Sequence, residues 1–119
     1  MISRAENLLD RPLPQCINSE LALVSILVVG EEKAAGVMGK IRDKLDAADF
    51  MDEQMRRVYS DIQDRFDAGT SRLSTRLIVS NYETSFARSF LERIAKFSEQ
   101  RIGTAVEHAN RIRDAAIRR

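Results

Sequence analysis

The sequence is poor in the residues that form disulfides, metal sites and turns. Its 119 residues include one cysteine, one histidine, two prolines, five glycines and no tryptophan. Cys16 alone cannot form an internal disulfide, and this cysteine usage suits a reducing compartment. His108 has no second histidine and no neighbouring cysteine with which to bind zinc. We therefore expect neither a metal nor another cofactor.

The chain also lacks an excess of charge of either sign and any long hydrophobic run. Its formal net charge is +1, which gives no overall attraction to nucleic acid or to an anionic membrane. No apolar run reaches the roughly 20 residues that a membrane-spanning helix needs. Residues 1–20 hold two arginines against three acidic residues, whereas a signal peptide begins with positive charge. We expect a cytoplasmic protein that binds no membrane.

The remaining composition favours helices around one apolar segment. Hydrophobic residues make up 44% of the chain and charged residues 31%, which is typical of a soluble globular protein. The longest apolar run, residues 17–29, is apolar on most sides, so we expect a helix surrounded by other helices. Asn18 would cap its start, Glu20 would face its positive end, and Gly30 would end it in a left-handed conformation. A buried strand is the alternative, since valine and isoleucine also favour strands.

The rest of the chain predicts further helices. Pro12 and Pro14 disfavour helix before them, so residues 1–15 are expected to form a flexible leader. Gly36 and Gly39 would weaken an isolated helix, and their presence predicts a close approach to a neighbouring helix. The further helices are expected over residues 31–45, 52–68, 70–81, 82–96 and 98–119.

The predicted helix over residues 52–68 carries a regular charge pattern opposite its apolar stripe. Acidic residues precede basic residues by one helical turn, an order that stabilises a helix. The pairs are Asp52–Arg56, Glu53–Arg57 and Asp61–Arg65. We expect this face to be solvated and to carry no active site.

These elements predict an all-α fold, a compact bundle of about six helices with the first helix at its centre. Residues 16–97 would form a globular head and residues 98–119 a C-terminal helix with an apolar stripe. Two arrangements of this helix stay open: it packs back on the head, or it projects as one arm of a hairpin and is covered by another chain. In the second case the candidate residues of a dimerisation interface are Ile102, Val106, Ala109, Ile112 and Ala116.

Catalytic motifs are not found. The run Gly36-Val37-Met38-Gly39-Lys40 has two residues between its glycines, where a phosphate loop has four, and Ile41 follows in place of Ser or Thr. No serine, nor Cys16, lies in the sequence context of an activated nucleophile. We expect no enzymatic activity.

Arginines gather at the C-terminal end of the chain. Cations at a helix C-terminus interact favourably with the helix dipole, which is one explanation. Contact with phosphate groups is the other, although no aromatic residues are interleaved for base stacking. The candidate phosphate-contact residues are Arg111, Arg113, Arg118 and Arg119.

Several stretches follow one another in an order known from a protein family. Residues 14–27 form a proline-flanked segment that is rich in Leu and Val and contains Glu20. Asp49-Phe50 forms a junction, and residues 56–62 (Arg-Arg-Val-Tyr-Ser-Asp-Ile) bear a basic, an aliphatic and an aromatic residue and are followed by Gly69. Together with the terminal residues 109–119, they resemble the N-terminal domain of the bacterial replicative helicases of the DnaB family. Residues 109–119 are similar to the first arm of the helical hairpin that follows the globular head of that domain.

The resemblance implies a non-catalytic protein-interaction and oligomerisation domain that acts in DNA replication. Such a domain would form part of the helicase collar as a homodimer or higher homo-oligomer, and would contact primase or a helicase loader. The ATP-dependent helicase activity would belong to an ATPase domain elsewhere in the parent protein. One alternative is the helicase-binding C-terminal domain of bacterial primase, which has a closely related fold. The other is a small nucleic-acid-binding helical domain.

Overall fold

The described part of the chain is helical throughout. The computed structural model describes residues 14–30, 32–69, 78–97 and 102–118. Its elements are α2 (Pro14–Val29), α3 (Glu32–Ile41), the 3-10 helix η1 (Ala47–Asp49), α4 (Glu53–Asp67), α6 (Thr84–Ala95), the 3-10 helix η2 (Ile102–Thr104) and α7 (Ala105–Arg118). These residues contain no strand, so the all-α prediction is confirmed and the strand alternative for residues 17–29 is wrong. None of the described helices is long and apolar enough to cross a membrane.

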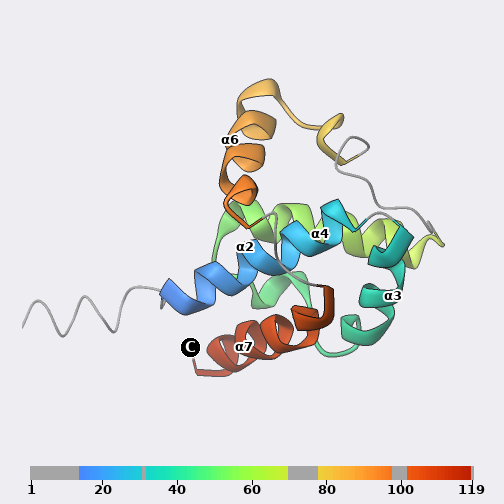
Figure 1. Cartoon of the computed structure of the whole chain (residues 1–119), viewed down its shortest axis with the longest axis vertical. Helices are drawn as coiled ribbons and strands as arrows, with labels where there is room; N and C mark the ends of the chain where they lie inside the picture. The colour runs from blue at the N-terminus through green and yellow to red at the C-terminus, as the bar shows by residue number, and fades with distance from the viewer. Residues whose placement is uncertain (1–13, 31, 70–77, 98–101, 119) are drawn as a thin grey trace, which may run out of the picture.

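Helix α2 lies at the centre of the bundle, as predicted. It contacts α3, α4, α6 and α7, most extensively α7, which runs along it on the lower side in Figure 1. Leu23, Val24 and Ile26 point in different directions around α2, and all three are buried. A helix that is apolar on most sides is stable in water only when neighbours cover each side. The other helices of the bundle provide that cover.

The two ends of α2 differ from the predicted ones. The helix begins at Pro14, so Asn18 lies inside it and does not cap it. A proline fits the first turn because its fixed φ is helical and its missing N–H has no partner there in any case. Gly30 does not adopt the predicted left-handed conformation; a Cβ on it would lie 2.7 Å from the Ile26 carbonyl oxygen, so this close approach requires glycine.

The glycines of α3 correct a second prediction. Gly36 and Gly39 are exposed, and a Cβ added to either would meet no atom within 4 Å. The expected close helix contact at these glycines is therefore wrong. The face that packs on the core carries Ala34, Val37 and Met38 instead, all of which are buried.

Helix α4 matches its predicted range closely. Asp52 caps its start by accepting a hydrogen bond from the Met55 amide at 3.0 Å. Gly69, with φ of 88°, ends the segment in the left-handed region that favours glycine. The buried stripe includes Val58, Tyr59 and Ile62, and the predicted amphipathic helix is confirmed. The predicted helix over residues 70–81 and the leader before Pro14 lie largely outside the described residues.

Helix α7 packs back on the head. Its apolar stripe lies against α2 and α3, and Ala105, Ala109 and Ile112 are buried in the same core as the other helices. The arrangement in which this helix projects as a free arm is not the one observed. Ile117, two residues before the end of the sequence, is the exception, with 71% of its surface exposed.

The two isoleucines of α7 give a matched test of this packing. Ile112→Ala should lower the free energy of unfolding by about 2–4 kcal/mol, because it leaves a cavity in the core. Ile117→Ala should change it by less than about 0.5 kcal/mol, because the side chain is exposed. Urea denaturation followed by circular dichroism measures both. Equal effects of the two substitutions would contradict the packing of α7 on α2.

Candidate functional site

A buried carboxylate on α2 holds the start of α4. Glu20 is fully buried, and its two oxygens accept hydrogen bonds from the backbone amides of Met51 and Asp52, each at 2.9 Å. The Cys16 thiol donates to the same carboxylate at 3.3 Å. Burial raises the pKa of Glu20, and the hydrogen bonds from the two amides and the thiol offset this only in part. The charge of Glu20 is thus used to join two helices.

A second carboxylate joins α4 to α6. Asp52 accepts two hydrogen bonds from Arg93, at 2.7 and 2.9 Å, while it also caps α4. Arg93 donates a further hydrogen bond to the Gln54 side-chain oxygen at 3.0 Å. Burial alone would raise the pKa of Asp52, but Arg93 and the Met55 amide outweigh it, so the pKa lies below its ordinary value. A two-point arginine–carboxylate pair of this kind fixes the direction as well as the distance of its partners.

Beside this pair, Arg57 lies on two aromatic rings. Its guanidinium carbon is 4.9 Å from the centre of the Tyr82 ring and 4.6 Å from that of the Phe86 ring. The Tyr82 hydroxyl donates to the Asp61 carboxylate, which holds the ring in place. In the described part of the chain Arg57 therefore makes cation–π contacts, and the predicted pair with Glu53 does not form.

These residues border an open groove between α4 and α6, which we call the α4–α6 groove. Its apolar part comes from Ile17, Met51 and Phe86, all half-buried, and the polar network of Asp52, Gln54 and Arg93 forms one side. Glu53, Arg57 and Ser89 lie at its exposed rim. The prediction that this face of α4 is merely solvated is wrong for Asp52 and Arg57, because both have tertiary partners.

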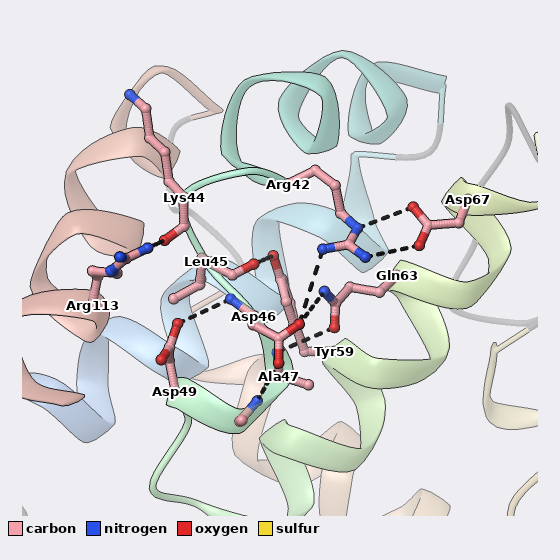
Figure 2. Close-up of polar contacts among 11 residues, drawn as sticks. Arg42, Lys44, Leu45, Asp46, Ala47, Asp49, Tyr59, Gln63, Asp67 and Arg113 are labelled. Atoms are coloured by element: carbon pink, nitrogen blue, oxygen red, sulfur yellow. Dashed lines mark hydrogen bonds and ion pairs between the residues drawn. The ribbon is translucent and has the colours of Figure 1, made fainter. Parts of the chain in front are cut away.

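A second polar surface surrounds the connection between α3 and α4 (Figure 2). Gln63 is buried, and its amide accepts from the Ala47 backbone at 3.1 Å and donates to Asp46 at 3.2 Å. The Tyr59 hydroxyl donates to the Leu45 carbonyl at 3.1 Å. These hydrogen bonds fix the backbone of the connection, so the groups that make them serve structure.

Two further contacts border the same surface in Figure 2. Arg42 donates to both oxygens of Asp67, at 3.0 and 2.9 Å, and so ties α3 to the end of α4. Arg113 of α7 donates to the Lys44 backbone carbonyl. Both contacts are exposed to solvent, so they contribute little to stability.

The residues predicted for a dimerisation interface lie mainly inside the chain's own core. Ala109 and Ile112 are buried, and Val106 and Ala116 are half-buried. The side chain of Ile102 is outside the described residues. The stripe is therefore covered by α2 and α3 and is not available as a face for a second chain while α7 stays packed.

The predicted phosphate-contact arginines lie on the exposed side of α7. Arg111, Arg113 and Arg118 are exposed, and Arg119 is outside the described residues. Arg113 has its contact with the Lys44 carbonyl, so it is partly engaged. The structure brings none of these arginines together around one binding pocket in the part of the chain that it describes.

Some residues of the groove were not singled out from the sequence. Arg93 carried no signal except a charge on a predicted helix, because its partner Asp52 lies 41 positions earlier. Glu20 did carry a signal, since a carboxylate within an apolar run that is buried on all sides needs partners. Its predicted role at the start of its own helix is wrong, because it binds the start of α4 instead.

The other features considered for phosphate binding, metal binding or catalysis are the run of residues 36–40 and His108, and both lie within helices. The run of residues 36–40 lies within α3, where the backbone amides are used by the helix and cannot wrap a phosphate. The described residues contain no group of three or more metal-ligating side chains. Nδ1 of His108 lies 3.4 Å from the Ser19 hydroxyl, at the contact between α7 and α2.

Comparison with known proteins does not identify a relative. No protein-family model, no curated protein and no solved structure matches this chain.

The Glu20 hydrogen bonds can be tested by two substitutions. Glu20→Ala should lower the free energy of unfolding by about 2–4 kcal/mol, because the two partly buried amides of Met51 and Asp52 lose their acceptor at about 1–3 kcal/mol each. Glu20→Gln should cost less, because it keeps the volume and one acceptor and removes a buried charge. Glu107→Ala, at an exposed position of α7, serves as the control in the same urea denaturation. Wild-type stability of Glu20→Ala would contradict the role assigned here.

The single histidine predicts a pH dependence. Burial lowers the pKa of His108 below its ordinary value of 6.5, nearby Arg111 lowers it further, and Glu107 opposes them. Around this pH the folded state thus binds fewer protons at His108 than the unfolded state does. The contribution of the neutral histidine to the free energy of unfolding is therefore fully present above pH 6.5, and it decreases as the pH falls below that value. Urea denaturation between about pH 7.5 and 5.5 should show this fall in the wild type and a smaller one in His108→Gln. The same slope in both proteins would contradict it.

Proposed function

We propose that this chain is a non-catalytic protein-interaction and oligomerisation domain of a replicative DNA helicase of the DnaB type. Its partners in this proposal are a primase or a helicase loader and further copies of the chain, and its place is the cytoplasm. The proposal rests on the resemblance of residues 14–27, 49–50, 56–62 and 109–119 to the N-terminal domain of that family.

The observation that best supports the resemblance is that its separate motifs contact one another around residues 50–52, just before α4. Glu20 of the first helix binds the Met51 amide, directly after the Asp-Phe junction. Phe50 of that junction is buried and stacks on Tyr59, with ring centres 4.6 Å apart. Arg56 donates to the Phe50 carbonyl at 3.2 and 3.0 Å. Residues that act together in this way constrain one another, which favours a common fold over a chance match of short motifs.

The use of the charged groups supports a role without catalysis. Glu20, Asp52 and Arg93 hold helices together, and Asp46 and Gln63 fix a loop. A general acid or base needs a group that can reach a substrate, and these groups face one another and the backbone. A surface that recognises other proteins requires a stable scaffold of this kind and no reactive centre.

Titration against replication proteins of the same organism tests the proposal. Calorimetry of the chain with the primase or the helicase loader should show saturable binding at micromolar concentration, the range expected of a transient interface. An unrelated helical domain of similar size and net charge serves as the control. Binding to the replicative helicase alone would instead favour the primase-domain alternative.

The nucleic-acid alternative has its own signature in the same experiment. Binding to single- or double-stranded DNA that weakens steeply with salt, and again in the double variant Arg113→Ala and Arg118→Ala, would favour it. Binding to none of these proteins, and to no DNA, would contradict the proposed function.

A further inference from the structure

Self-association of this chain needs a surface that its own core does not use. The apolar stripe of α7 does not qualify, because Ala109 and Ile112 are buried against α2 and α3. Ile117 is exposed at the end of α7, but a single exposed apolar residue is common on protein surfaces. The α4–α6 groove differs, because half-buried apolar side chains and exposed charges lie there together.

Of the four charged side chains in the groove, two bind each other and the other two, Glu53 and Arg57, are exposed to a partner. Asp52 and Arg93 neutralise each other through a two-point contact at 2.7 and 2.9 Å. Glu53 and Arg57 are both exposed and lie one helical turn apart on α4. Arg57 lies on the aromatic rings and not against Glu53, so this acid and this base form no ion pair with each other in the described part of the chain.

We propose that the α4–α6 groove is an interface between two copies of this chain, related by a two-fold axis that passes between Glu53 and Arg57. In a two-fold interface the same patch faces itself, so each residue of one copy meets the second residue of the pair in the other copy. Glu53 of each copy then lies opposite Arg57 of the other, and two ion pairs form across the axis. This inference rests on the self-association in the proposed function.

The pair favours a second copy over other occupants. A uniformly acidic partner would be repelled by Glu53, and a uniformly basic partner would be repelled by Arg57. A copy of the chain satisfies both charges at once and also covers Ile17, Met51 and Phe86. The groove is small beside the roughly 800 Å² per partner of a stable interface, so we expect a weak dimer with a micromolar dissociation constant.

The aromatic rings prepare Arg57 for this contact. The Tyr82 hydroxyl is held by Asp61, and the Tyr82 and Phe86 rings, with centres 4.7 Å apart, lie 4.9 and 4.6 Å from the guanidinium carbon of Arg57. Such cation–π contacts use the positive charge and not the N–H groups, which can still donate to a partner. Since the side chain is held before the partner arrives, less conformational entropy is lost when the ion pair forms.

Charge reversal with rescue tests the interface. Sedimentation velocity of the full chain over a wide range of concentrations should show a monomer–dimer equilibrium. Glu53→Arg and Arg57→Glu should each weaken it at least about tenfold, because like charges then face each other across the axis. An equimolar mixture of the two variants should recover wild-type association, because every contact between unlike copies again joins an acid and a base.

Matched controls separate the interface from general charge effects. Arg88→Glu, at an exposed position of α6 outside the groove, and Glu107→Arg on α7 reverse single charges elsewhere and should leave association unchanged. Arg57→Glu also loses the aromatic stacking, so Glu53→Arg is the cleaner variant. Circular dichroism and thermal unfolding of each variant check that it is folded, and Glu53→Gln replaces any reversal that is not.

Three results would overturn the inference: a monomer at every concentration, association that Glu53→Arg leaves unchanged, or a mixture that associates no better than the single variants. Each is distinct from failure of the proposed function. A chain that binds primase or loader but shows one of these results keeps its function and loses this interface. A chain that shows rescue but binds neither protein keeps the interface and loses the replicative role.

Discussion

The fold depends on the burial of residues 19–28 of α2, and on the hydrogen bonds that satisfy the few polar groups among them. Ser19, Glu20 and Ser25 are all buried among the apolar side chains of this helix. Burying a polar group without a partner costs several kcal/mol, on the order of the net stability of a small domain. Each of these three groups therefore needs a hydrogen-bond partner, and each has one outside α2.

The partners come from three different parts of the chain. Ser19 faces His108 of α7, Glu20 binds the amides before α4, and the Ser25 hydroxyl donates to the Phe97 carbonyl after α6 at 3.1 Å. Hydrophobic burial alone would let these helices slide or rotate on α2, because it has no direction. These three directed contacts fix which part of the chain lies on which side of α2. The buried polar groups thus select one arrangement from the many that burial permits.

Internal contacts also determine which side chains remain on the surface for a partner. Asp52 and Arg93 bind each other and hold α6 on α4, and the apolar stripe of α7 covers α2. What remains for partners lies where the packing of α4 against α6 is open and long side chains bridge the gap. This is why the proposed contact surface lies at the α4–α6 groove and not on the helix whose sequence most suggested an interface.

The sequence by itself determined the helical class, the central position of residues 17–29 and the limits of α4, because these follow from local periodicity, capping and the length of an apolar run. Tertiary structure decided the rest. The face of α3 that packs, the partners of Glu20 and Arg57, and the return of α7 to the head all depend on contacts between residues far apart in the chain. An isolated helix with an apolar stripe has equal reason to meet its own core or another chain. Only the space left on α2 by the other helices decides between them.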